Sequence, residues 1–359
     1  MVNILESYES KVFRRYMNMT LGREKVCFLN TPTPLEQLET VSRELGIRFY
    51  MKRDDLTNYG TGGNKLRKLE YFVKDAQNRG ATMLLTVGGA QTNHGRLTAA
   101  VAARYGFRSA IVAVDPYPGE ISANLLLDGI MGCQVYLVRE DGRTPDSQLL
   151  QDAVARVTKE WEEKGERVYF IPMGGSDELG ALGYYDCALE LDAQIREQGI
   201  TNPHIIVTVG SMGTYMGLAT AIANEHLDMK LTGIGIMPYR DIAGHALDYY
   251  ERVKKTYGLE AVLKAEDFHI NTDFDYGAYN NPVEDVRKAI YYMGRKEGII
   301  LDPCYTGKTF NAIKKLAERG ELPKEDSYIM IHTGGIPGIY TKHHRSEMEV
   351  ELMNYMHII

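Results

Sequence analysis

One lysine lies where its amine could take part in chemistry. Residues 60–68 read GTGGNKLRK, so three glycines lead into Asn64, Lys65 and a predicted helix. The start of a helix and the neighbouring cations Arg67 and Lys68 both disfavour a further positive charge, which lowers the pKa of a lysine amine. Such an amine can attack a carbonyl carbon or act as a general base. The structural alternative is a solvated, basic helix start.

Two further glycine-rich segments are suited to binding an anion. In residues 88–96, GGAQTNHGR, Thr92 or Asn93 can cap a predicted helix whose free N–H groups would bind a carboxylate or a phosphate. Residues 209–217, VGSMGTYMG, form a small-residue turn that opens another helix, as in a phosphate cradle. Its glycines lack the G-x-G-x-x-G spacing of a dinucleotide site. Ordinary helix capping is the alternative for the first segment, and the second is a weak signal by itself.

Two glycine-containing segments near the end of the chain complete the set. Residues 301–309, LDPCYTGKT, end like a P-loop, but that motif needs a glycine where Asp302 stands, which excludes a nucleoside triphosphatase. Residues 332–338, HTGGIPG, are by themselves a glycine-rich turn. The lysine turn, the anion-binding helix start and the phosphate cradle together would suit a phosphorylated aldehyde that is held by its phosphate and joined to Lys65. Pyridoxal phosphate (PLP) is the cofactor that needs these parts.

Strands and helices alternate along the chain and must position these segments. Such alternation, with short continuous apolar strands, predicts mostly parallel sheets covered by helices on both faces, with ligands beyond the carboxyl ends of the strands. The pattern restarts near residue 175, and the poorly patterned residues 264–282 are a candidate loop over a site. The predicted strands are 48–54, 82–87, 109–115, 133–138, 167–172, 204–210, 230–237 and 327–335. The predicted helices are 64–79, 93–106, 121–131, 147–164, 178–198, 213–224, 241–257, 283–298 and 308–319.

Composition narrows the class of protein. The chain has 359 residues, which suggests about two domains, and its 44% hydrophobic and 25% charged residues are those of a globular protein. A net charge of −7 lacks the basic field of nucleic-acid binders. Neither a signal peptide nor an apolar run of membrane-spanning length is visible, so we expect no membrane partner. The four cysteines form no C-x-x-C pair, which argues against a metal site or a disulfide framework and suits the cytoplasm.

Four segments together resemble the D-cysteine desulfhydrase / 1-aminocyclopropane-1-carboxylate (ACC) deaminase family. They are KRDDLTNYGTGGNKLRKLEY (52–71), VGGAQTNHGRLTAAVAARYG (87–106), LDPCYTGKT (301–309) and HTGGIPG (332–338). The resemblance implies an α/β, tryptophan synthase β-like fold (PLP fold type II) with two three-layer αβα domains and mostly parallel sheets. It also implies a smaller domain, 67–175, inserted into a larger PLP-binding domain, 1–66 plus 176–359. A homodimer is implied as well.

The resemblance also implies roles for the residues that match the family's motifs. Lys65 would carry the cofactor and act as the base at the substrate Cα, and Asn93 would bond the phenolic oxygen of PLP. The catalytic set would be Lys65, Thr92, Tyr279 and Tyr305. The cofactor-binding set would be Lys65, Lys68, Asn93, Gly210, Ser211, Met212, Gly213, Thr214, Thr306 and Thr333. The substrate-binding set would be Gln91, Thr92, Asn93, His94, Tyr279 and Tyr305.

Two positions bear on the reaction. ACC deaminases of the family carry Glu and Leu where this chain has Thr306 and Thr333, and desulfhydrase-like members carry Thr at both. A hydroxyl leaves the pyridine nitrogen largely neutral, which is adequate for β-elimination of a good leaving group. We therefore expect a carbon–sulfur lyase that converts D-cysteine, a small amino-acid substrate, to pyruvate, ammonia and sulfide. The alternatives are L-cysteate sulfo-lyase, then ACC deaminase, and in a different class a PLP-binding protein without efficient turnover.

Overall fold

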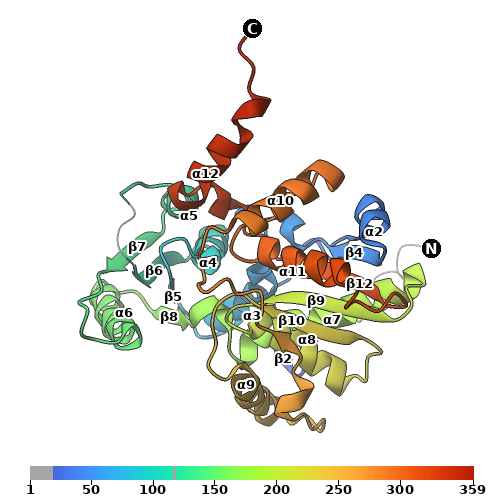
Figure 1. Cartoon of the computed structure of the whole chain (residues 1–359). Helices are drawn as coiled ribbons and strands as arrows, with labels where there is room; N and C mark the ends of the chain where they lie inside the picture. Colours follow the sequence, from blue (N-terminus) through green and yellow to red (C-terminus); the bar gives the residue numbers. More distant parts are fainter. Residues whose placement is uncertain (1–18, 116–118) are drawn as a thin grey trace, which may run out of the picture.

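Two separate sheets form the framework of the molecule (Figure 1). This computed structural model describes residues 19–115 and 119–359. Residues 1–18, which include the start of the predicted larger domain and the stretch searched for a signal peptide, lie outside the described residues. The larger sheet has six strands in the order β11 (Ile270–Asn271), β10 (Lys230–Gly235), β9 (Pro203–Val209), β12 (Ser327–Ile331), β4 (Arg48–Lys52) and β3 (Leu35–Gln37). The smaller sheet has four, in the order β7 (Gln134–Val138), β6 (Arg108–Val114), β5 (Met83–Gly88) and β8 (Val168–Ile171).

The strands pair in parallel in both sheets, except β3, which runs antiparallel to β4. A small antiparallel pair, β1 (Met19–Thr20) and β2 (Arg23–Glu24), stands apart. The predicted α/β class with mostly parallel sheets is therefore confirmed. The predicted strand 327–335 ends earlier, at Ile331, because Gly334 and Gly335 have φ values of 84° and 103° that a strand does not use.

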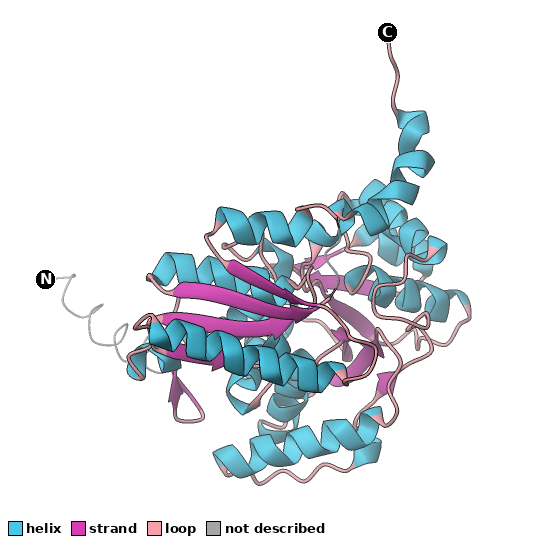
Figure 2. Ribbon diagram, turned by 90° about the vertical axis from the view of Figure 1, so that its left-hand side faces the viewer, coloured by secondary structure: helices cyan, strands magenta, loops and turns pink. Residues whose placement is uncertain are grey.

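Helices lie on both sides of the larger sheet (Figure 2). They are α2 (Glu39–Leu45), α3 (Lys65–Asn78), α4 (Asn93–Tyr105), α5 (Ala123–Ile130), α6 (Asp146–Glu163), α7 (Glu178–Gln198), α8 (Gly213–Asn224), α9 (Ile242–Tyr257), α10 (Glu284–Glu297), α11 (Thr306–Glu318) and α12 (Lys342–Leu352). The described residues also contain the short 3₁₀ turns η1 (Asp54–Leu56), η2 (Met173–Gly175), η3 (Ala265–Asp267), η4 (Ile336–Tyr340) and η5 (Met353–Tyr355). Within the described ranges, no helix combines the length and the apolar character that crossing a membrane requires.

Strand β9 shows why both faces of the larger sheet are covered. Ile205 and Val207 join one buried cluster with residues of α7, α8 and α9. Ile206, which points the other way, joins a second cluster with residues of α10 and α11. The smaller sheet behaves alike, since Leu84 packs with residues of α3 and α4 and Leu85 with residues of α6. Continuous apolar strands are thus buried on both sides, as parallel sheets require.

The predicted domain limits stay a prediction. Every strand of the smaller sheet falls between Met83 and Ile171. Helix α3, however, begins before the predicted limit at 66/67 and packs against α7 of the larger layer, where a Cβ at Gly183 would lie 2.5 Å from the Arg67 carbonyl carbon. The segment 264–282, expected to be a loop, contains η3 and the two-residue strand β11, and is irregular from 272 onward. The glycine-rich segments follow the carboxyl ends of β5, β9 and β12, as expected.

Candidate active site

Lys65 is the first residue of α3, and a tight turn leads into it. Gly63 has a φ of +131°, and a Cβ there would lie 3.0 Å from the carbonyl oxygen of Thr333. The backbone N–H of Asn64 donates to the same oxygen at 3.1 Å. Only a glycine can bring the chain this close to the end of β12, so the turn fixes where the lysine begins.

The Lys65 amine is half-buried and has no carboxylate partner among the described residues. Its Nζ lies 3.2 Å from Oδ1 of Asn64, and burial lowers the pKa of Lys65 to about 8. The cause differs from the one we predicted, because the Arg67 guanidinium is bound by Asp54 and Glu190 and burial alone produces the shift. A larger share of the Lys65 amine than of an ordinary lysine amine is therefore uncharged near neutral pH.

A second lysine, Lys68, marks an anion-binding cradle. Its side chain is fully buried, and its Nζ donates to the carbonyl of Gly174 at 3.1 Å and to Oγ of Ser176 at 3.3 Å. Burial, and then the Lys65 charge, hold the pKa of Lys68 well below its usual range. A Cβ at Gly213 would lie 2.5 Å from both Lys68 Nζ and Ser176 Oγ. A buried amine and a hydroxyl thus converge on the start of α8, as a phosphate group would require.

The segment between β9 and α8 supplies the other side of this cradle. Met212 has a φ of +63° and precedes the first turn of α8. The Ser211 and Ser176 hydroxyls lie 2.8 Å apart. The Tyr239 hydroxyl donates to the carbonyl of Gly210 at 2.6 Å and steadies the turn. Thr214 is bound differently, because its Oγ1 accepts from Asn64 Nδ2 at 2.9 Å and so ties α8 to the Lys65 turn.

Helix α4 contributes polar groups from the smaller sheet. Thr92 caps the helix, its Oγ1 accepting the N–H of Gly95 at 3.2 Å. Asn93 Oδ1 accepts from Asn124 at 3.0 Å and from Arg96 at 3.3 Å, which leaves its amide nitrogen as a donor without a partner in the described structure. Arg96 also donates to the carbonyls of residues 60 and 62. The Asn93 end of α4 is therefore tied to the Lys65 turn.

Gln91 and His94 flank these groups. The Gln91 side chain is engaged by Asn124, whose backbone N–H donates to Oε1 at 2.9 Å. His94 is buried, and neither of its ring nitrogens has a hydrogen-bond partner in the described structure. Burial, followed by the charges of Lys65 and Lys68, holds the pKa of His94 well below its usual range, so the ring is neutral. The His94 ring belongs to this site, whereas the Gln91 amide has a structural partner.

Two tyrosines face each other at the larger-sheet side. The Tyr279 and Tyr305 hydroxyls are hydrogen-bonded, and their rings lie edge to face with centroids 5.6 Å apart. A Cβ at Gly210 would lie 3.7 Å from the Tyr305 ring, which places that ring beside the cradle. Burial raises the pKa of both phenols, so both keep their protons near neutral pH.

The two threonines that bear on the reaction are placed differently. The Thr306 hydroxyl is fully buried, donates to Oδ1 of Asp302 at 2.6 Å and accepts the Asp302 N–H at 2.8 Å. Thr333 meets the Lys65 turn through its carbonyl. No described hydrogen bond joins the Thr306 hydroxyl to the Lys65 group, so its role at a ring nitrogen stays a prediction.

The contacts bring most of the predicted residues together. One chain of contacts joins Lys65, Asn64 and Thr214, a second joins Lys68, Ser176, Ser211 and Gly213, and a third joins Tyr279, Tyr305 and Gly210. Sequence reasoning missed Asn64 as a link and Ser176 entirely. The paired glycines before Ser176, which both have positive φ, are the signal that could have indicated a close approach there.

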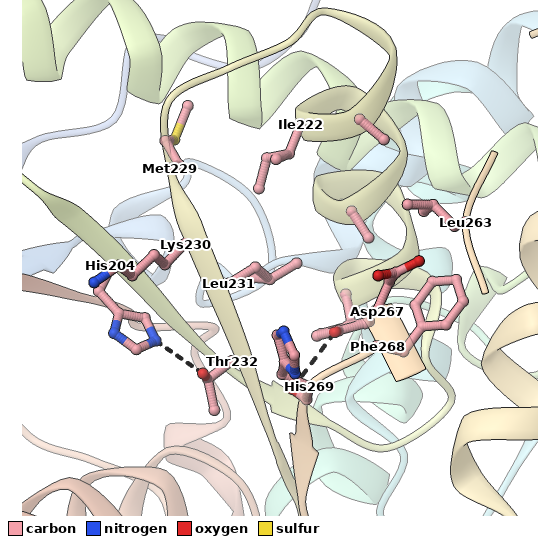
Figure 3. Close-up of a pocket in the computed structure, with 13 residues that line it drawn as sticks. His204, Ile222, Met229, Lys230, Leu231, Thr232, Leu263, Asp267, Phe268 and His269 are labelled. Carbon is pink, nitrogen blue, oxygen red and sulfur yellow. Dashed lines mark hydrogen bonds between the residues drawn. The ribbon is translucent and has the colours of Figure 1, made fainter. Parts of the chain in front are cut away.

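A cavity of about 510 Å³ lies elsewhere (Figure 3). It opens at the amino ends of β9 and β10, where His204 and Thr232 are hydrogen-bonded at 2.8 Å. His204 and Val209 are five positions apart along β9, which is about 17 Å at the usual rise per residue. Its lining is largely apolar, and it contains none of the groups described above. Within residues 19–115 and 119–359, no cluster of three or more His, Cys, Asp or Glu residues could hold a metal ion.

Comparisons with known proteins agree on one family. A family model described as "Pyridoxal-phosphate dependent enzyme" matches residues 26–334. The chain is 35% identical over 332 residues to a protein named putative 1-aminocyclopropane-1-carboxylate deaminase from Pyrococcus abyssi, covering 92% of this chain and 96% of that protein. It is 36% identical over 323 residues to a D-cysteine desulfhydrase from Salmonella typhimurium, covering 88% and 95%.

Solved structures give the same picture. The crystal structure of an ACC deaminase homologue matches with a TM-score of 0.79 at 32% identity, covering 92% of this chain and 96% of that one. Threonine deaminase isoform 2 from Solanum lycopersicum matches with a TM-score of 0.60 at 17% identity, covering 90% and 84%, and shows likeness of fold alone.

Proposed function

The chain belongs to the family of pyridoxal-phosphate dependent enzymes, and we propose that its reaction is β-elimination from a small sulfur-bearing amino acid, D-cysteine first. It is a PLP-dependent lyase of fold type II. The observation that carries the proposal is the half-buried Lys65 amine, with its pKa lowered to about 8, beside an anion-binding cradle. Relatives named for two reactions match at 35% and 36% identity, so the substrate is inferred from Thr306 and Thr333.

The residues present fit the cofactor. Within the described residues the buried Lys68 amine has no hydrogen-bonded carboxylate, and the absence of a side chain at Gly213 keeps space beside it. We propose that Lys65 bonds the aldehyde carbon and that the Asn93 amide donates to the phenolic oxygen. Thr306 and Thr333 would face the ring nitrogen. The phosphate would be held by Lys68 and Ser176 with Gly210, Ser211, Met212, Gly213 and Thr214. When bound, the cofactor supplies an electron sink for charge that develops on the substrate Cα.

The chain's own residues would divide the proton transfers between them. The uncharged Lys65 amine would take the Cα proton at Nζ. The start of α4, with Thr92 as its cap, would bind the substrate carboxylate, because free N–H groups and the helix dipole favour an anion there. Tyr305, with Tyr279 beside it, holds its phenolic proton and would deliver it to sulfur as the Cβ–S bond breaks and sulfur leaves with the electron pair.

The Lys65 pKa gives a prediction for the apoenzyme. Only the uncharged amine attacks an aldehyde, so the rate at which apoenzyme takes up pyridoxal phosphate should rise with pH, with its midpoint at a pH of about 8. Stopped-flow absorbance across a pH series measures this rate. A midpoint near the ordinary lysine value of about 10.4 would contradict the assigned environment.

Gly213 gives a second prediction. In Gly213→Ala the new Cβ would push against Lys68 Nζ and Ser176 Oγ, the groups proposed to hold the phosphate, so the Kd for pyridoxal phosphate should rise at least about tenfold. Gly129→Ala is the matched control, because a Cβ there meets nothing within 4 Å inside α5. Titration of each apoenzyme with the cofactor measures the change. Equal affinity in the two variants would remove Gly213 from the cradle.

A product assay tests the proposed reaction. Purified holoenzyme is incubated with D-cysteine, L-cysteine, L-cysteate and ACC, and sulfide, sulfite and 2-oxo acids are measured in parallel. We expect sulfide and pyruvate from D-cysteine. Sulfite from L-cysteate would select the sulfo-lyase, and 2-oxobutanoate from ACC would select the deaminase. A holoenzyme that yields no product from any of them would favour a PLP-binding protein without efficient turnover.

Compartment and assembly are also part of the proposal. Cys133, Cys187 and Cys304 are free thiols, which supports a reducing compartment such as the cytoplasm. A homodimer is inferred from the family resemblance. The net charge of −7 argues against nucleic acid as a binding partner. Light scattering on the holoenzyme as it elutes from a size-exclusion column would give twice the mass of one chain if the protein is a homodimer.

A further inference from the structure

The loop that carries Tyr279 is held by a buried charge. Residues 272–283 contain neither helix nor strand, and Tyr279 reaches Tyr305 from there. The Lys308 Nζ lies under this loop and donates to the carbonyls of Asp275 at 2.8 Å, Ala278 at 2.7 Å and Tyr279 at 3.3 Å. A fourth carbonyl, from residue 236 after β10, lies 2.8 Å away. The ammonium thus binds the backbone carbonyls of three residues of the loop.

Lys308 has no other evident task. Its side chain is fully buried, and no carboxylate forms an ion pair with it in the described part of the chain. Burying an ammonium without a carboxylate is unfavourable unless other oxygens replace its hydration. Here backbone carbonyls replace it, and in return an irregular segment has its carbonyls hydrogen-bonded.

The start of α11 supplies both residues that contact Tyr279. Tyr305 stands immediately before α11 and Lys308 lies three residues later, on the next turn. The Tyr305 hydroxyl is hydrogen-bonded to the Tyr279 hydroxyl, and the Lys308 Nζ donates to the Tyr279 carbonyl. The adjacent Asn280 is held from the other side, where its Oδ1 lies 2.6 Å from His344 Nε2 on α12. The start of α11 therefore holds both the backbone and the side chain of Tyr279.

We propose that Lys308 is a positioning residue that fixes the Tyr279 hydroxyl against Tyr305. Its consequence for turnover rests on the proposed function of the two tyrosines, whereas its hold on the loop does not. Lys308 would act on the chemical step through Tyr279 and would leave cofactor binding unchanged, because its contacts are with the loop and the carbonyl of residue 236 and not with the Lys68 cradle.

The first test measures the loop itself. Lys308→Met keeps the length of the side chain and removes the charge. Lys315→Met is the matched control, because Lys315 lies on the same helix and pairs with Asp285 at the surface. In hydrogen–deuterium exchange of the holoenzyme, peptides covering 272–283 should exchange at least about tenfold faster in Lys308→Met and at the normal rate in Lys315→Met. Equal exchange in both variants would overturn the proposal, whatever the substrate is.

The second test measures the route through Tyr279. Lys308→Met, Tyr279→Phe and the double variant are compared by kcat and KM with the substrate found in the product assay. We expect kcat to fall at least about tenfold in each single variant, KM and the cofactor absorbance to change little, and the double variant to lose no more than Tyr279→Phe alone. A double variant whose loss in kcat is the product of the two single losses, or a Lys308→Met variant with full activity, would overturn the proposal. If the wild type releases no product, the proposed function fails, and the exchange result still decides whether Lys308 holds the loop.

Discussion

Replacement of Lys65 by alanine should abolish turnover and the visible absorbance of lysine-bound cofactor. The amine is the only group of the site placed at the glycine turn with a pKa lowered to about 8, and both covalent attachment and proton removal from Cα are assigned to it. Loss of one group with both tasks should lower kcat by about 10³-fold or more. The measurements are the absorbance spectrum with added pyridoxal phosphate and the rate of 2-oxo acid release.

The control for this variant lies on the same helix. Lys74→Ala removes a lysine of α3 that pairs with the exposed Glu24, so absorbance and rate should match the wild type. Lys65→Ala should itself fold normally, because its Nζ has one hydrogen bond, to Asn64, and such a loss is small for stability. A Lys65→Ala protein that keeps both the lysine-bound absorbance and the turnover would contradict the assignment.

Asp54→Ala should be the most damaging change to stability. Asp54 is fully buried and accepts hydrogen bonds from the Arg67 guanidinium at 2.8 Å, from the Thr33 hydroxyl at 2.8 Å and from the Tyr184 hydroxyl. Without this carboxylate the buried guanidinium keeps Glu190 and the Thr33 hydroxyl, so the free energy of unfolding should fall by about 3 kcal/mol. Urea unfolding measures the difference. Glu36→Ala is the control, because Glu36 is a half-exposed partner of Arg53, and less than about 1 kcal/mol is expected.

The Asp54 carboxylate also predicts how the stability of the protein depends on pH. Burial opposes ionisation of Asp54, but the Arg67 charge outweighs it and lowers the pKa of Asp54 to about 2. A carboxyl whose folded pKa is depressed contributes stability above its unfolded pKa of about 3.9, and that contribution is lost as the pH falls toward 2. The gap in stability between wild type and Asp54→Ala should therefore narrow below about pH 4. A gap under about 1 kcal/mol at neutral pH would contradict the network's importance.

Most of the fold could be predicted because its elements carry their own pattern. Helices α7 and α8 fall on the predicted bounds 178–198 and 213–224, since apolar residues mark both helices and Gly199 ends α7. Helices α2 and α12 were not predicted. Helix α2 has 7 residues and buries only Val41, and α12 buries only His344 and Met348, so neither presents an apolar face that sequence reasoning can detect.

The site divides in the same way. Lys65, Asn93 and the 210–214 segment could be found because each lies in a glycine-rich junction after a strand. Ser176 and Lys308 could not, because their roles depend on contacts with Ser211 and with the 275–279 backbone, which are far apart in sequence. The cause of the Lys65 pKa was also misjudged, because neighbours in sequence such as Arg67 turn to buried carboxylates elsewhere.

Covalent labelling tests the central claim most directly. The holoenzyme is treated with borohydride, which fixes pyridoxal phosphate to the lysine that carries it, and the digested protein is analysed by peptide mass spectrometry. The account predicts one modified residue, Lys65, with Lys68 unmodified because its buried amine is proposed to hold the phosphate. Modification at Lys68 or any other lysine, or a coloured holoenzyme with no modified lysine, would contradict it.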